Sequence, residues 1–309
     1  MKALVIKSTG SWYTVEAKGG LLYECRIKGR FRLDNIKSTN PIVVGDFVEI
    51  KKEEDSWMII KLFERKNQIV RKSVNLSKQT HIIASNIDQA FLIVTLAFPE
   101  TTTGFIDRFL VSANAFGVEV ILLFNKNDLY ESNTLLKQDK IVNIYEKIGY
   151  ECYLISALND DLNNIQKKLQ GKNTLISGHS GVGKSTLINK LLKSNKIPTQ
   201  EISLTHKQGQ HTTTFSELYR IDFGTTIIDT PGIKGFGLVD LDENKIDKYF
   251  PEFLLYKKEC KFHNCIHKNE PNCNIKKKIK EDEIAESRYK NYLTMLEEDE
   301  ENYRQNNYQ

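Results

Sequence analysis

Residues 178–186 read Gly-His-Ser-Gly-Val-Gly-Lys-Ser-Thr, a segment whose residue types and spacing suit the binding of phosphate groups. Glycines at 178 and 183, followed by Lys184 and Ser185, have the spacing of a phosphate loop, in which backbone amides surround phosphate oxygens. Lys184 supplies a positive charge for the outer phosphates, and the Ser185 hydroxyl is placed for Mg²⁺. The predicted nucleotide contacts in this loop are Gly178, His179, Ser180, Gly181, Val182, Gly183, Lys184, Ser185 and Thr186.

The segments on both sides of this loop fit the same interpretation. Residues 173–177 form a short strand-like run, and Leu187, Ile188, Leu191 and Leu192 form the apolar stripe of a helix. The phosphates would then lie at a helix N-terminus, which favours anions. A chance glycine-rich turn is the alternative, but it does not explain why strand, loop and helix follow one another.

A second polar segment, Asn125-Lys126-Asn127-Asp128, directly follows the strand-like run 120–124. Open α/β sheets bind ligands at the carboxyl ends of their strands. The Asp128 carboxylate can accept hydrogen bonds from N1 and the exocyclic amino group of guanine, whereas adenine lacks this pair of donors. Taken alone, the tetrapeptide is more typical of a polar turn between a strand and a helix than of a guanine-binding segment.

Ser156 and Ala157 follow a further strand-like run at 152–155. A backbone amide of this dipeptide could donate to the guanine carbonyl, although the dipeptide is weak evidence by itself. Together with the phosphate loop, the two segments predict GTP rather than ATP as the nucleotide.

Two polar segments downstream of the phosphate loop are predicted to sense the γ-phosphate. Residues 209–214 are a polar run in which Thr213 offers a hydroxyl to Mg²⁺. The run 225–228 leads to Asp229, which suits the Mg²⁺ shell, and to Gly232, whose amide can approach the γ-phosphate. Because such contacts exist only while the γ-phosphate is present, we interpret both segments as switches.

Four potential metal ligands lie within fourteen residues near the C-terminal end of the sequence. The spacing Cys260-x4-Cys265-x-His267-x5-Cys273 suits a tetrahedral Zn²⁺ ion with a structural role. His263 is the alternative imidazole, and incidental free thiols are the alternative to a metal site.

The elements that position these residues predict a multidomain protein. Residues 1–70 show short β-branched runs separated by turns, which favours a five-stranded OB-type β-barrel. Residues 71–240 alternate buried strand-like runs with amphipathic helices, which predicts an α/β GTPase domain with a mainly parallel sheet. Residues 241–309 are predicted to form a helical zinc-binding domain. We place an irregular, basic connector at residues 65–80.

Positive charge gathers at both ends of the predicted α/β domain. Between Tyr23 and Leu33, cations alternate with apolar residues, so that one face of a predicted strand carries Arg26, Lys28, Arg30 and Arg32. Such a face suits a nucleic-acid backbone, and an edge strand protected by charge is the alternative. Residues 257–280 hold eight lysines against two glutamates, which adds a second basic region.

The composition is that of a globular protein, with 309 residues, 40% hydrophobic residues and a net charge of +4. No apolar stretch approaches the roughly 18 residues that a membrane span needs. Five cysteines, three of them in the metal-ligand cluster, argue against a disulfide framework. We therefore expect a cytoplasmic protein that acts without a membrane.

The order of the motifs is unusual. In Ras-like GTPases the phosphate loop and switches come before the guanine-reading motifs, whereas here they come after them, so a circular permutation of that fold is predicted. This order, the barrel and the cysteine cluster resemble the RsgA (YjeQ) family of circularly permuted GTPases that act on the small ribosomal subunit. Further segments that carry the resemblance are residues 44–48, 86–89, 106–110, 211–213 and 229–232.

The resemblance implies a GTP hydrolase that binds the small ribosomal subunit and its rRNA, with one structural Zn²⁺ and with Mg²⁺ accompanying GTP. We expect a monomer that exchanges GTP and GDP. An RNA-binding adaptor that uses GTP only as a structural ligand is the alternative from another functional class.

Hydrolysis itself needs a group that orients water. Ras-type enzymes carry a glutamine directly after Asp-x-x-Gly, but Ile233 occupies that position and an aliphatic side chain cannot orient water. His211, beside the threonines, is the predicted substitute, and the family resemblance also points to it. His179 is a second candidate, and an ordinary solvated loop histidine is the alternative for His211.

Overall fold

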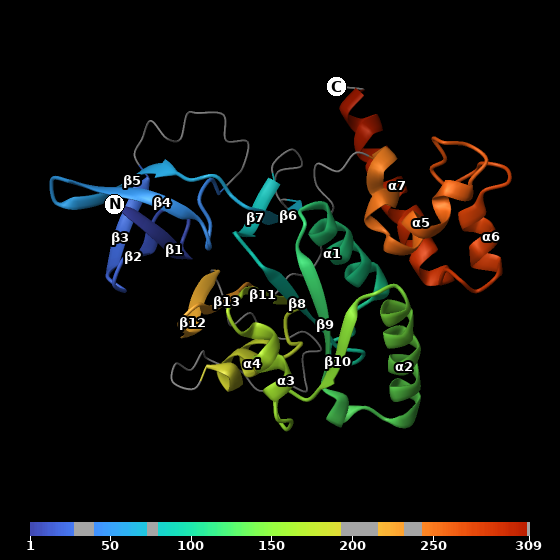
Figure 1. Cartoon of the computed structure of the whole chain (residues 1–309), viewed down its shortest axis with the longest axis horizontal. Coiled ribbons are helices and arrows are strands. Elements are labelled where there is room, and N and C mark those ends of the chain that lie inside the picture. Colours follow the sequence, from blue (N-terminus) through green and yellow to red (C-terminus); the bar gives the residue numbers. More distant parts are fainter. Residues whose placement is uncertain (28–39, 73–79, 193–215, 232–242, 308–309) are drawn as a thin grey trace.

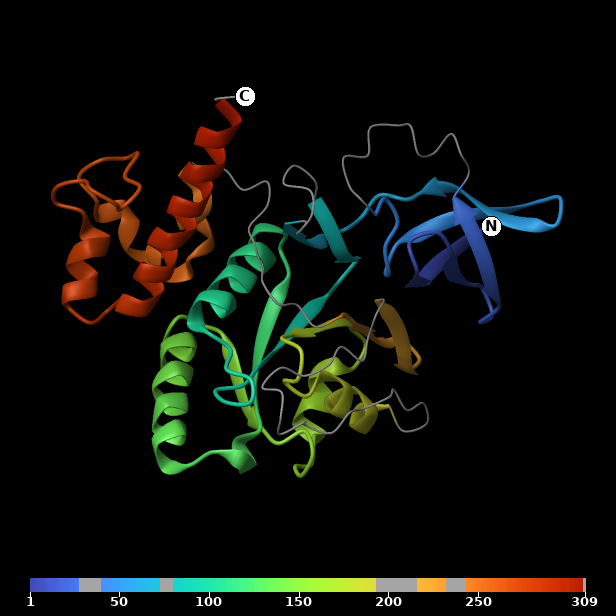
Figure 2. The same ribbon diagram turned by 180° about the vertical axis from the view of Figure 1, so that it is seen from behind.

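The computed structural model describes residues 1–27, 40–72, 80–192, 216–231 and 243–307. An N-terminal barrel, a central α/β part and a C-terminal group of helices follow one another along the chain (Figure 1). The barrel and the C-terminal helices lie on opposite sides of the central part, and the view from behind agrees (Figure 2). The predicted multidomain fold class is confirmed.

The N-terminal part is a closed five-stranded barrel. Its strands follow the order β1-β2-β3-β5-β4, and β1 also pairs with β4, which closes the sheet on itself. Alternate side chains point inward, so that Val5, Val15 and Ile59 are fully buried in the barrel core. The strands are β1 (Lys2–Ser8), β2 (Tyr13–Ala17), β3 (Leu22–Ile27), β4 (Phe47–Glu53) and β5 (Ser56–Leu62).

The connector at residues 65–80 is not irregular as expected, because it contains one strand and ends at the start of another. β6 (Gln68–Lys72) and β7 (Thr80–Ser85) pair antiparallel as a separate two-stranded sheet. Ile69 and Val70 are adjacent and both buried. Burial on both faces hides the period of two that usually reveals a strand.

The central sheet has the strand order β10-β9-β8-β11-β13-β12. Its pairs are parallel, except that β12 runs antiparallel to β13. The strand-like runs found by sequence analysis correspond to β9, β10, β11 and β13. The strands of the sheet are β8 (Gln89–Val94), β9 (Glu119–Asn125), β10 (Glu151–Ile155), β11 (Asn173–Gly178), β12 (Glu217–Asp222) and β13 (Thr225–Asp229).

Helices cover both faces of this sheet. Ala90, Leu92 and Val94 of β8 belong to the core under α1 and α2, whereas Phe91 and Ile93 belong to the core under α3 and α4. A strand buried on both faces is therefore apolar throughout, as the sequence is here. The helices are α1 (Thr103–Ala115), the short η2 (Asn127–Leu129), α2 (Ser132–Lys147), α3 (Asn163–Leu169) and α4 (Lys184–Leu191).

The barrel joins the central sheet edge to edge. Lys7 of β1 is paired with Glu217 of β12, so that barrel and sheet form one continuous hydrogen-bonded network of strands. A glycine is required nearby, because Gly45 has a φ of +94° and a Cβ there would lie 2.1 Å from the Ser85 carbonyl oxygen.

The C-terminal part is helical. Its core contains Phe250, Phe253, Ile275 and Tyr292, and Val111 of α1 packs into the same cluster. The elements are η3 (Glu243–Tyr249), α5 (Pro251–Tyr256), η4 (Lys257–Glu259), α6 (Asn274–Lys280) and α7 (Glu286–Asn307).

Within the described ranges, none of the helices has the length and apolar character needed to cross a bilayer.

Candidate functional site

The phosphate loop connects β11 to α4 at the centre of the sheet, as its spacing predicted. Two of its glycines are required by close approaches. A Cβ on Gly183, whose φ is +100°, would lie 2.4 Å from Nδ2 of Asn125. A Cβ on Gly178 would lie 2.7 Å from the Ile93 carbonyl oxygen. The loop is therefore packed against the ends of neighbouring strands, and no larger residue fits at either position.

Lys184 opens α4 and turns back over the loop. Its ammonium donates to the carbonyl oxygens of Gly178 at 2.9 Å and His179 at 2.8 Å. Burial lowers the pKa of this ammonium to about 8, although the Asp229 carboxylate acts in the opposite direction. Nucleotide phosphates would supply negative charge next to a buried cation, and the interaction would be strong because water is largely excluded.

Asn125, the last residue of β9, connects the phosphate loop to the guanine segments, that is, to the predicted base-binding residues 125–128 and 156–157. Its Nδ2 donates to the Val182 carbonyl oxygen at 2.7 Å, and its Oδ1 accepts from the Ala157 amide at 2.8 Å. One buried side chain thus fixes three loops that are far apart in sequence. This contact was not predicted from the sequence, because its partners are separated from Asn125 by 57 and 32 residues.

Lys126 reinforces the same connection. Its φ is +69°, and its ammonium donates to the carbonyl oxygens of Gly181, at 2.8 Å, and Phe98. Burial lowers the pKa of Lys126 to about 8, against the opposing effect of the Asp128 carboxylate. The side chain therefore lies along the phosphate loop and supports it.

The predicted base-selecting carboxylate is exposed. Oδ2 of Asp128 accepts a 2.9 Å hydrogen bond from the side-chain amide of Asn159. This contact leaves Oδ1 to face solvent or a ligand and fixes the direction of the carboxylate. Asn127, next to it, is half-buried.

Ser156 and Ala157 lie beside Asn125 and Asp128, but neither amide is a free donor. The Ser156 amide donates to the Asp160 carboxylate at 2.6 Å, and the Ala157 amide donates to Asn125. Among the described residues the next amide, that of Leu158, has no acceptor. The Ala157 amide is therefore already used by Asn125, and the Leu158 amide is the next backbone donor along this loop.

The rest of the predicted nucleotide site is only partly described. Ser180, Ser185 and Thr186 are half-buried in and after the loop. Asp229 is fully buried at the end of β13, paired in the sheet with Ile176 of β11. The predicted residues His211, Thr213 and Gly232 lie outside the described residues, as does Ile233.

His179 has a neighbour that the sequence did not reveal. Its ring lies 3.9 Å, centroid to centroid, from the ring of Phe105 in α1. α1 also contributes Val111 to the C-terminal core. One helix therefore contacts both the phosphate loop and the C-terminal part.

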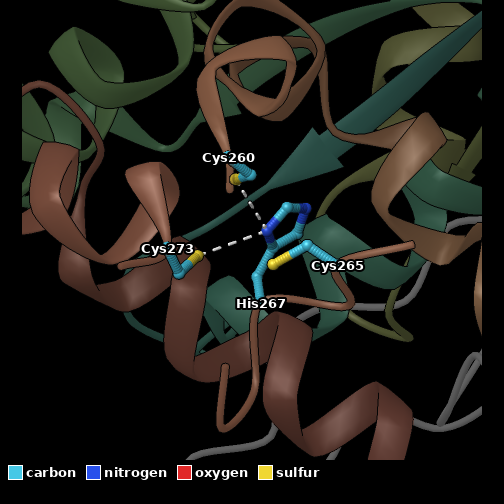
Figure 3. A group of neighbouring side chains, drawn as sticks. All are labelled: Cys260, Cys265, His267 and Cys273. Atoms are coloured by element: carbon cyan, nitrogen blue, oxygen red, sulfur yellow. Dashed lines mark hydrogen bonds between the residues drawn. The ribbon is translucent and has the colours of Figure 1, made fainter. Parts of the chain in front are cut away.

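The predicted metal ligands come together. One donor atom from each of Cys260, Cys265, His267 and Cys273 lies within 4.8 Å of the others. Figure 3 shows the His267 ring between Cys260 and Cys273, with Cys265 beside it. Nδ1 of His267 is 3.7 Å from the Cys260 sulfur and 3.4 Å from the Cys273 sulfur. His263, the alternative imidazole, is exposed and is not a member of the group.

These distances fit a shared metal ion. Zinc bonds of about 2.3 Å to sulfur and about 2.0 Å to nitrogen place tetrahedral N and S ligands about 3.6 Å apart. Although burial raises its pKa, hydrogen bonding to His267 brings the Cys273 thiol down to a pKa of about 7, which favours a thiolate ligand. The other ring nitrogen of His267 points to the Asp247 carboxylate, 3.8 Å away, a common outer partner of metal-binding histidines.

Tyrosines of α7 hold the loop that carries His267. The hydroxyl of Tyr289 donates to the carbonyl oxygen of His267 at 2.7 Å, and that of Tyr292 to Ile266 at 2.6 Å. The cluster is thereby attached to the last helix.

Of the predicted RNA-binding cations, only Arg26 is described. It is exposed on β3, and its guanidinium carbon lies 3.9 Å from the ring centroid of Trp12. Lys28, Arg30 and Arg32 lie beyond the described part of the barrel.

A phosphate loop after the central strand β11, with the predicted guanine segments after β9 and β10 on one side and Asp229 at the end of β13 on the other, defines a circularly permuted GTPase. Two solved structures share this arrangement. YjeQ from Thermotoga maritima is 33% identical with a TM-score of 0.74, covering 96% of this chain and 97% of its own. YloQ, described as a circularly permuted GTPase, is 26% identical with a TM-score of 0.69, covering 97% and 95%.

Sequence comparison agrees over the full length. Residues 2–60 match the model of the RsgA N-terminal domain, and residues 62–239 match that of the RsgA GTPase. A Christiangramia forsetii protein named small ribosomal subunit biogenesis GTPase RsgA is 55% identical over 100% of both chains. Its namesake from Flavobacterium johnsoniae is 56% identical over 98% of this chain and 95% of the relative. The chain belongs to the RsgA GTPase family and is a GTPase.

Proposed function

We propose that this protein binds the small ribosomal subunit in its GTP form, acts in late assembly of that subunit, and leaves after hydrolysing GTP. The observation that carries this proposal is the joining of phosphate loop and guanine segments through Asn125. It occurs in a chain that aligns end to end with relatives named for small-subunit biogenesis.

The nucleotide would occupy the site as follows. Backbone amides of residues 178–186 surround the phosphates, and the Lys184 ammonium turns from its carbonyl acceptors toward them. Asp128 selects guanine, with its carboxylate held by Asn159. Ser185 and Thr213 would hold Mg²⁺, with Asp229 in the surrounding shell, and the Gly232 amide would donate to the γ-phosphate.

Water activation is assigned to His211, since Ile233 cannot replace the glutamine of Ras-type enzymes. A GTPase without that glutamine is expected to turn over slowly alone. Binding to the subunit would bring a catalytic group into position and raise the rate. Partner-supplied or partner-ordered groups contribute ~10³ to 10⁵ in rate in other GTPases.

Three domains divide the work in this proposal. Residues 1–70 form an RNA-binding barrel through Arg26, Lys28, Arg30 and Arg32. Residues 71–240 form the GTPase domain, and residues 241–309 form a zinc-binding helical domain. Zn²⁺ held by Cys260, Cys265, His267 and Cys273 would supply a structural cross-link.

Phosphate release from GTP, measured against a titration of purified small subunits, tests the proposal. We expect slow release alone and a strong, saturable increase with subunits. The adaptor alternative predicts no release in either condition. ATP as a competitor should leave GTP turnover unchanged, because adenine lacks the donors that Asp128 accepts.

His211→Ala tests the assigned catalytic role. The variant should lose the subunit-stimulated increase, by about 10³-fold or more, while its affinity for GTP stays close to that of the wild type. Stopped-flow binding of a fluorescent GTP analogue gives the affinity, and phosphate release gives the rate. An unchanged stimulated rate would remove His211 from the mechanism.

A further inference from the structure

Four residues form a row across the outside of the barrel, in the order Trp12, Arg26, Met58 and Lys51. Tyr13 pairs with Cys25, which places Trp12 beside Arg26 at the start of β2. Arg26 pairs with Met58 of β5, and Met58 pairs with Lys51 of β4. The neighbours Cys25 and Ile59 are fully buried, so alternation directs the whole row outward.

Trp12 and Arg26 are stacked on each other in this row. The guanidinium carbon lies 3.9 Å from the centroid of the Trp12 ring, a distance at which the planar cation contacts the ring. Trp12 nevertheless keeps 41% of its surface exposed, and Arg26 is exposed as well. An indole and a guanidinium are therefore held together and open to solvent.

The local fold does not need the indole in this position. The turn before β2 is closed by the backbone of Trp12, whose carbonyl oxygen accepts from the amide of Thr9 at 3.0 Å and from its hydroxyl at 3.2 Å. Tyr13, the next residue, supplies the buried ring of this strand. The exposed Trp12 side chain is thus left for a contact outside the chain.

The chemistry of the pair suits one kind of occupant. Aromatic and guanidinium planes stack on nucleobases, and the cations Arg26 and, two strands away, Lys51 suit the flanking phosphates. OB-type barrels bind oligonucleotides on the face of strands 2 and 3 and on the loop between strands 1 and 2, which is where this pair lies. Bases inside a duplex are already stacked on one another, so the occupant must be unpaired.

We propose that Trp12 and Arg26 form a stacking site for one unpaired nucleobase of an RNA strand, with Lys51 next to its backbone. The inference deepens the proposed RNA binding by the barrel and rests on it. The proposed ligand of this face is a single-stranded RNA segment. We expect its affinity to depend little on base identity, because every base has a stacking face.

Tryptophan fluorescence tests the site directly. The chain has two tryptophans, so the full-length Trp57→Phe variant leaves Trp12 as the only reporter. Trp57 packs against the barrel core and contacts Tyr23, with ring centroids 4.5 Å apart and the ring planes tilted by 56°. A mixed-sequence RNA of about eight nucleotides, within the site sizes known for OB folds, should quench Trp12 saturably. The same RNA in a blunt duplex, and heparin as a polyanion without bases, should not.

Substitutions test the contribution of the stack to affinity. In anisotropy titrations of labelled single-stranded RNA, Trp12→Ala should raise Kd about tenfold, and Trp12→Phe should raise it less because a ring is kept. Arg26→Lys keeps the charge but loses the planar group, so we expect it to raise Kd less than Trp12→Ala does. Phe223→Ala is the matched control, since Phe223 is fully exposed on the β12–β13 hairpin, away from this row, and should change nothing.

The outcomes are distinct. Equal quenching by heparin or duplex, or an unchanged Kd for Trp12→Ala, would overturn the stacking site. Quenching by whole small subunits without quenching by RNA would assign the face to a protein partner and would also overturn it. The quenching experiment leaves Trp12 in place, so it decides the matter even if Trp12→Ala does not fold. Absence of subunit-stimulated GTP turnover would contradict the proposed function while leaving a positive quenching result intact.

Discussion

The two ends of the chain are attached to the GTPase part by different kinds of contact. At the C-terminal junction, Arg288 of α7 donates to Asp107 of α1 at 2.6 Å and to both carboxylate oxygens of Glu252 in α5, at 2.7 and 3.1 Å. Only 1% of the Arg288 surface is exposed, 0% of Asp107 and 2% of Glu252. Tyr145 and Asn291 also donate to Asp107. This junction is a closed, buried network.

At the barrel junction the contacts with the sheet are open to water. Lys7 and Glu217 form an ion pair at 3.3 Å with 41% and 33% of their side chains exposed. Arg220 and Glu16 form another at 2.7 Å, with the arginine 45% exposed. The barrel also has a buried attachment, since the carboxylate of Asp46 binds Arg65 and Ser85, the last residue of β7, whereas the contacts of β1 and β2 with β12 are open to water.

The comparison of the two junctions shows which contacts can break at a low cost in free energy. Breaking a buried ion network leaves unpaired charges away from water, whereas exposed pairs are replaced by hydration. β12, the strand that touches the barrel, begins a few residues after the predicted switch threonines. The exposed contacts between the barrel and β12 are therefore suited to change with the bound nucleotide. The buried network of the C-terminal junction is suited to stay fixed.

Chelation of the metal proposed at the Cys/His cluster should have the largest effect, and this effect should be confined to the C-terminal helices. Structural zinc contributes an apparent ~10 to 16 kcal/mol in small zinc domains. Chelation should therefore accelerate hydrogen exchange strongly in residues 251–280, which surround the Cys/His cluster. Exchange in β1–β5 should not change.

Cys273→Ser should reproduce the effect of the chelator, because it removes one ligand. Cys152→Ser is the matched control, since Cys152 lies on β10 outside the cluster. Equal acceleration in barrel and C-terminal helices, or none in either, would contradict the assignment of the cluster as a local cross-link.

Arg288→Met should have the next largest effect. It leaves the Asp107 and Glu252 carboxylates buried without their cation, which typically costs about 3 to 5 kcal/mol. Urea denaturation of the full chain gives the free energy of unfolding. Arg288→Lys should recover part of the loss, because it restores the charge but not the paired donors. A decrease in the free energy of unfolding below about 1 kcal/mol would show that the Arg288 network contributes no more than an exposed ion pair.

Lys7→Met should have the smallest effect, between about 0 and 1 kcal/mol, since the pair with Glu217 is exposed. The charge-swapped double variant Lys7→Glu with Glu217→Lys measures the coupling between the two positions. A loss as large as that of Arg288→Met would show that the two junctions do not differ in kind.

Local spacing was enough to predict the phosphate loop and the metal ligands. Lys184 follows its glycines directly, and the ligands from Cys260 to Cys273 lie within one short segment, so their geometry is set by nearby backbone. The junctions could not be predicted in this way. Arg288 and Asp107 are 181 residues apart, and each alone is typical of an exposed helical residue.

The guanine segments are an intermediate case. Their positions at strand ends followed from the sequence, and Asp128 is where it was expected. The use of the Ala157 amide by Asn125 was not foreseeable, because it depends on how closely β9 and β10 approach each other. Residue types predicted which loops meet, and packing determined which atoms remain free.

The measurement that tests the account most directly is cosedimentation of the full chain with purified small ribosomal subunits. It should be made with a non-hydrolysable GTP analogue, with GDP, and with the Lys184→Ala variant as a control that cannot hold the phosphates. We predict retention on the small subunit with the analogue, release with GDP, and no nucleotide dependence in the variant. Equal retention with both nucleotides would contradict a GTP-controlled subunit-binding protein.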